Sequence, residues 1–448
     1  MKIAVVGAGW AGLAAASECL THGMQVTLFD ASHQAGGRAR GVSDPAIGQV
    51  DNGQHLLIGA YERTLALICR DVGAERTAMS FKRLPLWLES ADGKFALRRR
   101  HRVKNPRIDT ALALWSAHGL TLKDKWHITG LLRRLESGVH VPDSKLNLTV
   151  AQWLSNEHQT ENACRWLWHP LCLATMNTLP SEACAALFIK ILSDSLLSAQ
   201  ADATDLLIPS CNLSDLWPSA VASKVNARWG HVVRHLNLSH EGVAIDGEWF
   251  DACVLAVPPP SLARLLGSLN GFESLVSELE AFEFRAIATC YVGLGQAAAL
   301  PAPLLMFDHA DLNNENLAQW VFDRSSFMQS RPKAQLAFVI SCADNLPGLD
   351  DLDLAERLMK QLTRAIGHTQ RGEITGARCF QEKRATFAAR PGLRRPGATT
   401  RHPRLVLAGD WTDTRYPSVL EGAVISGINA AEELAQLSHQ LSHQLSRD

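Results

Sequence analysis

A glycine loop between two strand-like runs restricts the fold of this chain more than any other feature. Lys2–Val6 is a short apolar run typical of a buried strand, Leu13–Leu20 is rich in helix-forming alanine and leucine, and Gln25–Phe29 predicts a second strand. Between the first strand and the helix the sequence reads Gly-Ala-Gly-Trp-Ala-Gly, a Gly-x-Gly-x-x-Gly pattern. This order of elements predicts the first unit of a doubly wound α/β domain that binds a dinucleotide.

The residues of this loop have different predicted roles. Gly7 permits a tight turn, Gly9 lets the backbone approach a pyrophosphate, and Gly12 lets the helix and the strand pack closely. Trp10 and Ala11 lie in the same loop, directly before the helix, whose free N–H groups and partial positive charge favour phosphate. We therefore expect all five residues to contribute to a cofactor site.

An acidic residue closes the second strand. Asp30 stands 18 residues after Gly12, where a carboxylate accepts hydrogen bonds from the hydroxyls of a ribose. The alternative is a glycine turn in an ordinary α/β unit. Strand, loop, helix, strand and acid in the correct order favour the cofactor site over that alternative.

The segment after Asp30 distinguishes one cofactor from another. It reads Ala-Ser-His-Gln-Ala-Gly-Gly-Arg, with Gly36, Gly37 and Arg38 at its end. This resembles the extension found in the glutathione-reductase-like flavoproteins, in the branch that holds amine oxidases, protoporphyrinogen oxidase and carotenoid desaturases. The resemblance implies non-covalent FAD, with Arg38 neutralising a phosphate. No second Gly-x-Gly-x-x-Gly follows a strand, so no NAD(P)H domain is expected, and the sequence does not identify the electron donor.

Two later segments resemble the same branch. Near the end of the chain, the run Arg404–Ala408 leads into Gly409 and Asp410, and a helix opens further on at Glu421, Gly422 and Ala423. In the flavoprotein branch such an acid binds the ribityl or pyrophosphate region, and the helix N-terminus points at the flavin pyrimidine ring. In the middle, residues 226–257 predict a small β-meander, and the resemblance places the backbone of Val233 at the adenine, although a purely structural strand is an equal alternative.

These motifs predict a discontinuous domain organisation. The fold class is α/β, a glutathione-reductase-like doubly wound FAD-binding domain with an inserted α+β substrate domain. The predicted FAD domain comprises 1–60, 205–265 and 395–437, the substrate domain comprises 61–204 and 266–394, and a tail follows at 438–448.

A further resemblance narrows the family. The runs DNGQHLLIGAY at 51–61, EKRATF at 382–387 and AGDWTDTRYPSVLEGA at 408–423 resemble the bacterial squalene-associated flavoproteins, the hydroxysqualene dehydroxylases of squalene and hopanoid biosynthesis. The resemblance implies reductive removal of an allylic hydroxyl from a neutral C30 isoprenoid, giving squalene, water and oxidised FAD. It leaves open an association with the prenyl synthases that act upstream.

This reaction needs a proton donor, a dry apolar cavity and a hydride donor held against one carbon. By resemblance, Gln54 and His55 lie along the flavin. His55 is the first candidate for the proton donor or water-positioning group, and a role in orienting the loop is the alternative. Lys383 and Arg384 are second candidates, on a strand that either faces the flavin or lies at the surface. Tyr416, like Trp411, is either a wall of the pocket or scaffold.

Three rival functions remain open. An amine oxidase needs an aromatic cage, but Val419 stands where the cage tyrosine usually lies, which argues against it. A carotenoid-type desaturase uses similar hydride chemistry in the oxidative direction, and the sequence does not distinguish the direction. A non-catalytic flavin-binding partner of a prenyl-synthase complex is the third, which the complete set of FAD motifs disfavours.

Composition excludes some classes of protein. With 44 Lys and Arg against 45 Asp and Glu, the chain has no charge signature of nucleic-acid binding. Nowhere do 18 apolar residues follow one another, and Lys2 leads directly into the first strand, so neither a spanning helix nor a signal peptide is expected. Ten cysteines without a Cys-x-x-Cys pair argue against a zinc site and a disulfide framework, and no other metal spacing is present. We expect a cytoplasmic protein without a bound metal.

One segment leaves membrane contact open. Residues 96–107 carry six Arg or Lys and a His, and residues 112–135 have apolar residues at roughly helical spacing. A basic stretch beside an amphipathic helix suits the surface of an anionic membrane. A solvated loop beside a core helix is the alternative. The nearby tryptophans at 115, 126, 153, 166 and 168 suit an apolar pocket but are more often plain core.

Overall fold

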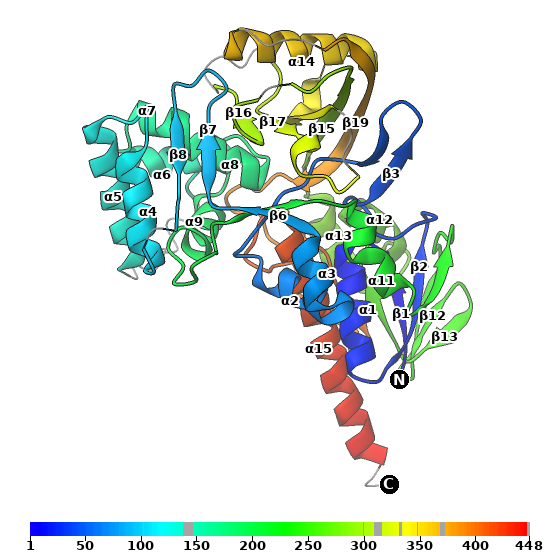
Figure 1. The fold of residues 1–448 in the computed structure, drawn as a ribbon. Helices are drawn as coiled ribbons and strands as arrows, with labels where there is room; N and C mark the ends of the chain where they lie inside the picture. The colour runs from blue at the N-terminus through cyan, green and yellow to red at the C-terminus, as the bar shows by residue number, and fades with distance from the viewer. Residues whose placement is uncertain are drawn as a thin grey trace.

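The computed structural model of the protein describes residues 1–101, 103–137, 147–298, 300–308, 316–330, 334–346, 348–367 and 372–445. Figure 1 shows three parts: a parallel sheet near the two chain termini, an antiparallel sheet above it, and a lobe of helices at the left.

The parallel sheet is assembled from three separate parts of the chain. Its strands, in spatial order, are β10 (Asn226–Trp229), β2 (Gln25–Asp30), β1 (Lys2–Val6), β14 (Ala252–Leu255) and β20 (Leu405–Leu407). All neighbouring strands pair in parallel. β1 lies in the middle because its apolar residues are buried on both faces of the sheet. This arrangement confirms the predicted α/β class and the assembly of the domain from discontinuous segments.

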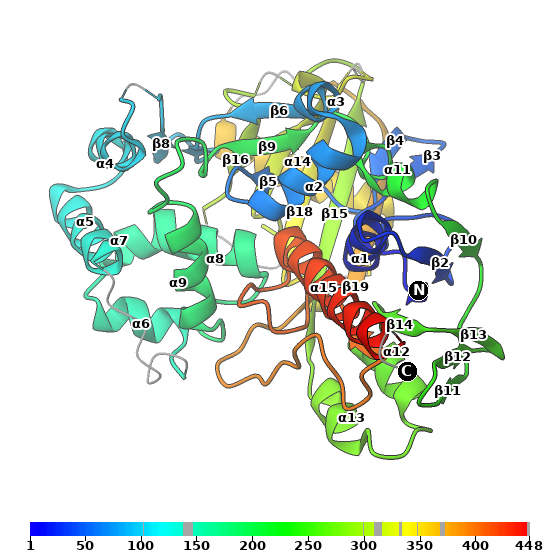
Figure 2. The ribbon, with the colours of Figure 1, turned by 90° about the horizontal axis from the view of Figure 1, so that it is seen from below.

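Helices from opposite ends of the chain cover one face of this sheet. Figure 2 shows α1 (Trp10–Thr21) beside α15 (Leu420–Leu445). They approach closely because small residues form the contact: a Cβ added to Gly427 would lie 2.2 Å from the carbonyl oxygen of Ala11. α2 (Glu62–Val72) also packs against α15. The predicted boundary between the two domains at residue 61 stays a prediction.

A small meander covers the opposite face of the sheet. It consists of β11 (Leu236–Leu238), β12 (Val243–Ile245) and β13 (Glu248–Phe250), paired in antiparallel order. The meander predicted over 226–257 is thus confirmed for its middle part, whereas β10 and β14 at its ends join the parallel sheet. Phe250 packs edge-on against Phe29 of the sheet, with ring centroids 5.8 Å apart.

The second large sheet is antiparallel. Its spatial order is β16 (Leu304–Met306), β17 (Trp320–Asp323), β18 (Gln335–Ser341), β15 (Phe284–Leu294) and β19 (Ile374–Phe387). α14 (Asp351–Ile366) lies along it, as Figure 1 shows, and buries Leu354, Leu358 and Leu362 at helical spacing. This sheet supplies one wall of the site described below.

The helical lobe stands at the edge of the molecule. It contains α4 (Pro106–Ser116), α5 (Leu122–Glu136), α6 (Val150–Asn156), α7 (Glu161–Ala163), the π-helical turn Cys164–Trp168, α8 (His169–Met176) and α9 (Ala185–Asp194). Trp153, Trp166 and Trp168 are buried in its core, whereas Trp115 and Trp126 are exposed.

Short elements connect these parts. The strands are β3 (Gly41–Asp44), β4 (Gly48–Asp51), β5 (Leu57–Ile58), β6 (Phe81–Leu84), β7 (Trp87–Glu89), β8 (Ala96–Arg98) and β9 (Leu206–Pro209). The helices are α3 (Ala74–Met79), α10 (Leu213–Leu216), α11 (Pro218–Ala222), α12 (Pro259–Leu266) and α13 (Glu273–Glu280), and 3-10 turns span Arg324–Ser326 and Ala343–Asn345.

The predicted tail continues the last helix. α15 runs on to Leu445, and residues 446–448 lie outside the described residues. None of the helices in the described ranges is long and apolar enough to cross a membrane.

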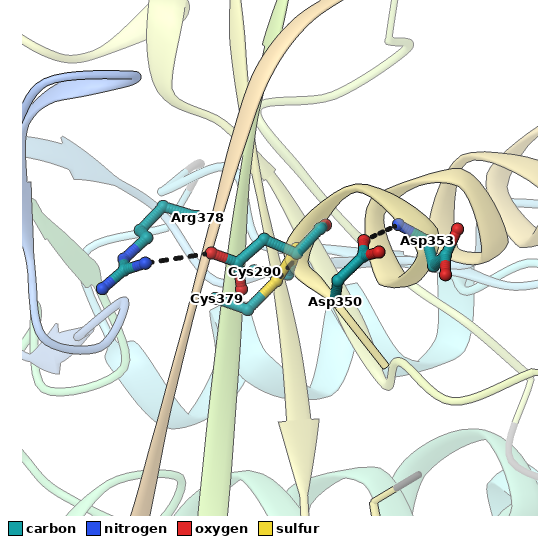
Figure 3. Close-up of a disulfide and its surroundings, with 6 residues drawn as sticks. Cys290, Asp350, Asp353, Arg378 and Cys379 are labelled. Carbon is teal, nitrogen blue, oxygen red and sulfur yellow. Dashed lines mark hydrogen bonds and ion pairs between the residues drawn. A yellow bond between two sulfur atoms is a disulfide. The ribbon is translucent and has the colours of Figure 1, made fainter. Parts of the chain in front are cut away.

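One pair of cysteines departs from the sequence-based expectation. Figure 3 shows Cys290 and Cys379 joined by a disulfide. The two residues are 89 positions apart in the chain, but β15 and β19 place them directly opposite each other. The expectation that the cysteines form no disulfide framework is therefore wrong for this pair, because strand register, which residue spacing does not reveal, brings the two sulfurs together. The other eight cysteines form no disulfide.

Candidate functional site

A cavity of about 700 Å³ lies where the three parts of the molecule meet. Both ends of the chain line it, through the glycine loop after β1 and the segment before α15. Residues 52–56 and the helices α4, α5, α8 and α9 line it as well. The cavity therefore connects the predicted cofactor loops with the helical lobe.

The glycine loop has the geometry that its predicted roles require. Gly7 adopts a φ of +109°, which favours glycine. A Cβ added to Gly12 would lie 1.9 Å from the carbonyl oxygen of Gly7, so only glycine permits this packing of helix and strand. Gly9 differs from both, because a Cβ added to it would meet no atom within 4 Å and would extend into the cavity that Gly9 lines. The open space beside the N-terminus of α1 fits a pyrophosphate group.

The second glycine loop lies directly against the first. The N–H of Gly36 donates to the carbonyl oxygen of Ala8 at 2.8 Å, and a Cβ on Gly37 would lie 2.9 Å from the Cα of Gly9. Trp10 and Ala11 also line the cavity. The two glycine loops therefore form one continuous cradle.

Asp30 and Val233 both line the same end of the cavity. The Asp30 carboxylate accepts hydrogen bonds from the N–H groups of Ala8 at 2.5 Å and Ser32 at 2.6 Å. Each carboxylate oxygen keeps a further lone pair, so Asp30 can still accept from a ribose hydroxyl. Half-buried Val233 lies in the loop before the meander and not in a strand. These positions fit the adenosine half of FAD.

Arg38 and Asp410, two of the predicted cofactor ligands, contact each other. The guanidinium of Arg38 lies 2.5 Å from a carboxylate oxygen of Asp410, and it also donates to the carbonyl oxygen of Ala385 at 2.8 Å. Both side chains line the cavity, as do Gly409 and Ala423. The expectation that Arg38 neutralises a phosphate omitted this ion pair, which ties the two ends of the chain together across the cavity.

Hydrogen bonds to three separate parts of the chain fix the segment after β4. Asn52 donates to the carbonyl oxygen of Arg38 at 2.8 Å. The N–H of Gln54 donates to Thr289 at 3.2 Å, and its side-chain oxygen accepts from Arg324 at 3.0 Å. Buried Arg324 was missed by sequence reasoning, because it lies 270 residues from its partner with no motif around it. These contacts position Gln54 and His55 at the cavity wall.

His55 faces the cavity in a form that suits accepting a proton. Its Nδ1 lies 2.7 Å from the carbonyl oxygen of Gly53, and since a carbonyl only accepts, Nδ1 carries the proton. Burial lowers the pKa of His55 below its ordinary value, although the Gly53 contact opposes this. The ring is then neutral with Nε2 as an acceptor. His55 therefore fits a role in positioning water or a ligand better than proton donation.

Asp51, just before this segment, is buried, and its carboxylate makes the stability of the protein depend on pH. Its carboxylate accepts from the N–H of Leu213 at 2.8 Å, and burial raises its pKa to about 7. A pKa raised in the folded state stabilises the protein below the unfolded value near 4, and the contribution is lost as pH rises through about 7. We expect the wild-type protein to lose about 3 kcal/mol of its free energy of unfolding between about pH 5 and pH 8, and the Asp51→Asn variant not to show this loss. Denaturant unfolding at both pH values measures this, and an identical pH dependence in both proteins contradicts it.

Lys383 and Arg384 do not reach the cavity. Both side chains are exposed on β19, while their neighbours Glu382 and Ala385 line the cavity. The side chains of a strand alternate between its two faces, and β19 is irregular beside this point, where its register with β15 shifts. The structure therefore supports the surface alternative for this pair and not a catalytic role.

Glu421 and Gly422 also lie outside the cavity lining. The Glu421 carboxylate accepts from the backbone N–H groups of Arg63 and Thr64, both at 2.9 Å, and from the Thr64 hydroxyl at 2.7 Å. It thus caps the first turn of α2 rather than contacting a cofactor. Gly422 leaves room for Tyr416, whose Cβ would lie 3.1 Å from an added Cβ. Both residues were predicted to contact the cofactor, but in the structure Glu421 caps α2 and Gly422 makes room for Tyr416.

This correction gives a second prediction. Glu421→Ala leaves the buried N–H of Thr64 and the partly buried N–H of Arg63 without their acceptor, so we expect it to lower the free energy of unfolding by about 2–4 kcal/mol while changing the FAD dissociation constant less than about threefold. The matched control is Glu432→Ala, an exposed position on the same helix. Thermal unfolding and flavin titration measure both quantities. A large loss of FAD affinity with unchanged stability contradicts the structural role.

A group of three polar side chains lies between the segment before α15 and α9. The Tyr416 hydroxyl donates to the carboxylate of Asp194, and the Lys190 ammonium lies 2.7 Å from the same carboxylate. Tyr416 and Asp194 line the cavity. Burial, followed by the hydrogen bond to Asp194 and its charge, raises the pKa of Tyr416, so its hydroxyl stays protonated. The sequence singled out Tyr416 but not Asp194 or Lys190, which stand in an ordinary helical pattern.

Beyond this group the cavity is lined mostly by hydrocarbon, with a few polar side chains such as Thr110 and Asn177 among it. The lining includes Leu114, Ile128, Leu132, Leu171, Phe188 and Leu192 from the helical lobe. Trp320, Phe322 and Val339 continue it on the antiparallel sheet. This apolar chamber suits a long neutral ligand, because it offers few partners to polar groups.

A dinucleotide cradle that opens into an apolar chamber is typical of an FAD-dependent oxidoreductase. The sequence profile of the family described as flavin containing amine oxidoreductase matches residues 10–435, and the chain belongs to this family.

Curated relatives match almost the whole chain. The hydroxysqualene dehydroxylase of Rhodopseudomonas palustris is 29% identical over 96% of this chain and 97% of its own length. That of Zymomonas mobilis is 25% identical over 97% of this chain and 99% of its own. A probable zeta-carotene desaturase of Synechococcus elongatus is 21% identical, again over 97% and 99%. The chain is therefore similar to enzymes with two different names.

Solved structures share the fold. The cyclohexylamine oxidase of Brevibacterium oxydans superposes with a TM-score of 0.68 at 14% identity, covering 98% of this chain and 99% of that one. A putrescine oxidase bound to putrescine superposes with a TM-score of 0.67 at 15% identity over 97% of this chain and 99% of that one. At this identity the likeness extends to the fold alone.

Proposed function

We propose that this protein removes the allylic hydroxyl of hydroxysqualene reductively, with squalene and water as products. The observation that carries the proposal is the apolar chamber, which is continuous with the FAD cradle and lined by hydrocarbon from both the helical lobe and the antiparallel sheet. Similarity to three hydroxysqualene dehydroxylases supports the same substrate. Apart from its hydroxyl, a neutral C30 isoprenoid buries only apolar surface in such a chamber, which favours its binding.

The reaction replaces a C–O bond by a C–H bond. FAD bound in its reduced form supplies the hydride, and one proton is needed to release the hydroxyl as water. The side chains of this protein must therefore hold the allylic carbon against the cofactor, exclude bulk water and provide the proton. The apolar lining meets the first two requirements.

Tyr416 is the proposed proton donor. Its hydroxyl is the donor in its contact with Asp194, and Lys190 places its ammonium nitrogen 5.2 Å from the centre of the Tyr416 ring. Because burial and the contact with Asp194 raise the pKa of Tyr416 and disfavour a phenolate, Tyr416 gives its proton to the leaving oxygen as it receives one from Lys190 through Asp194. Lys190 regains a proton from solvent, since its side chain is partly exposed. His55 keeps the role of positioning the hydroxyl through Nε2.

Two other functions use the same family of folds. A desaturase that acts on a carotenoid precursor needs a similar apolar chamber, and the similarity to a probable zeta-carotene desaturase favours it as the second candidate. Amine oxidation is disfavoured, because Val419 lines the cavity where an aromatic wall is expected.

The test is a single turnover without oxygen. The flavin of the purified holoprotein is photoreduced, hydroxysqualene is added, and the flavin spectrum and the extracted lipid are followed together. Reoxidation of the flavin with one squalene formed per flavin is the expected result. A flavin that stays reduced with hydroxysqualene, in a protein whose oxidised form desaturates squalene or a carotenoid precursor, assigns the protein to the desaturases instead.

A further inference from the structure

Several large apolar side chains are exposed to solvent on the outer surface of α4 and α5. In the described part of the chain, ten large apolar side chains are exposed, and five of them lie on these two helices. They are Ile108, Leu112, Trp115, Leu122 and Trp126, with 51%, 50%, 36%, 68% and 63% of their surface exposed. We call these five residues the outer apolar patch. The other five are scattered over distant elements, so this patch is not a general feature of the surface.

The patch is regular. Ile108, Leu112 and Trp115 follow one another at helical spacing and therefore share one face of α4. Leu122 and Trp126 stand one turn apart on α5. The rings of Trp115 and Trp126 meet edge to face with their centroids 5.5 Å apart, which joins the two helical faces into one surface. In Figure 2 both helices stand at the left rim of the molecule, away from the parallel sheet.

Basic residues lie beside this patch, although Arg98, Arg99, Arg107 and Arg134 of this region are held in ion pairs with acids. Residues 98–136 contain ten Lys and Arg but three Asp and Glu, whereas the whole chain has a net charge of −1. Two of the three acids are turned inward: Asp109 forms a buried ion pair with Arg99, and buried Asp124 caps α5. Lys104 and Lys123 are exposed next to the patch.

The inner surfaces of the same helices line the apolar chamber. Thr110 and Leu114 of α4, like Ile128 and Leu132 of α5, are part of the cavity wall. One layer of two helices therefore separates the outer apolar patch from the chamber proposed to hold the substrate. A bilayer that contacts the outer apolar patch would be separated from the chamber by this one layer of helices.

We propose that the outer apolar patch docks on an anionic lipid surface, with the apolar side chains entering the interface and the basic ones contacting the head groups. Apolar and aromatic side chains ringed by Lys and Arg bind such interfaces. A second copy of this chain is a poorer occupant, because a two-fold contact would place the basic residues against one another. Delivery of substrate through this layer rests on the proposed function, whereas docking itself does not.

The test is sedimentation of the full-length holoprotein with vesicles, without substrate. Vesicles of phosphatidylcholine with phosphatidylglycerol are compared with vesicles of phosphatidylcholine alone. We expect stronger binding to the anionic vesicles, weakened by salt. Leu122→Ser with Trp126→Ser is expected to lower the partition coefficient at least about tenfold. The matched control is Trp249→Ser with Leu352→Ser, at positions that are each 55% exposed on β13 and α14, and it should stay within about twofold of wild type.

A second pair of variants tests the charge. Lys104→Glu with Lys123→Glu should lower binding to anionic vesicles at least about tenfold, since each basic residue near the surface contributes roughly fivefold. Lys82→Glu with Lys360→Glu, exposed elsewhere, is the control. Flavin absorbance shows that each variant is folded.

Three outcomes overturn the proposal: absence of vesicle binding, equal losses in both apolar pairs, or a dimer in solution that Trp126→Ser converts to a monomer. Turnover with hydroxysqualene dispersed in detergent is measured separately. Loss of vesicle binding with full turnover there separates docking from the proposed reaction.

Discussion

Gly9→Val is expected to yield a folded protein that has lost its flavin. The backbone at Gly9 is extended, with φ of −73° and ψ of 175°, which valine adopts readily. A Cβ there meets no atom within 4 Å, so the substitution costs little in the protein itself. The added methyl groups instead occupy the space beside the helix N-terminus where the cofactor phosphates bind. Loss of one or two hydrogen bonds to a charged group raises the dissociation constant of FAD at least about 100-fold.

Gly12→Val is the informative contrast. Its Cβ would lie 1.9 Å from a backbone oxygen, so the helix and the strand must move apart. We expect this variant to be unstable rather than merely empty. Flavin content, thermal unfolding and far-ultraviolet circular dichroism separate the two cases. A Gly9→Val protein that retains stoichiometric FAD would show that the pyrophosphate does not lie at this loop.

Tyr416→Phe is expected to remove the proton donor while leaving the cofactor in place. The substitution keeps the ring and deletes the hydroxyl that lies between the cavity and Asp194. A positioned proton donor contributes roughly 100- to 10,000-fold to a rate, so the rate of flavin reoxidation by hydroxysqualene should fall by that factor. The substrate concentration for half-maximal rate should change little, because the apolar lining is intact.

His55→Asn is the matched variant at His55, the other candidate for the proton donor. If His55 only positions the hydroxyl, turnover should fall by about tenfold or less, far less than with Tyr416→Phe. Asp194→Asn should resemble Tyr416→Phe, since it interrupts the path from Lys190. Photoreduction and flavin content serve as controls for the three proteins. The reverse order, with His55→Asn inactive and Tyr416→Phe active, would return the donor role to His55.

The fold class and the cofactor cradle could be predicted because they depend on short stretches of chain. Gly7, Gly9 and Gly12 lie within six residues, and their roles follow from backbone geometry that neighbouring residues set. Asp30 completes the unit at the end of the next strand, where its carboxylate contacts the same loop. Patterns of this kind survive in the sequence because each requires a particular residue type at a particular spacing.

Side-chain partners at long range were harder to predict. The sequence suggested Lys383 and Arg384 as catalytic residues, but β19 exposes both and turns Glu382 toward the cavity. Glu421 belongs to a cofactor motif by resemblance, yet its carboxylate caps α2. Neither outcome follows from the motif, because strand register and helix packing decide which face a side chain occupies.

The sequence by itself therefore determined the fold class, the FAD cradle and the family of this protein, all of which depend on local backbone geometry. Only the tertiary structure decided which polar groups meet in the cavity. Tyr416 contacts Asp194 across 222 residues, and Arg324 holds Gln54 across 270. Such pairs form only after separate elements have packed, and no spacing along the chain encodes the distance between them.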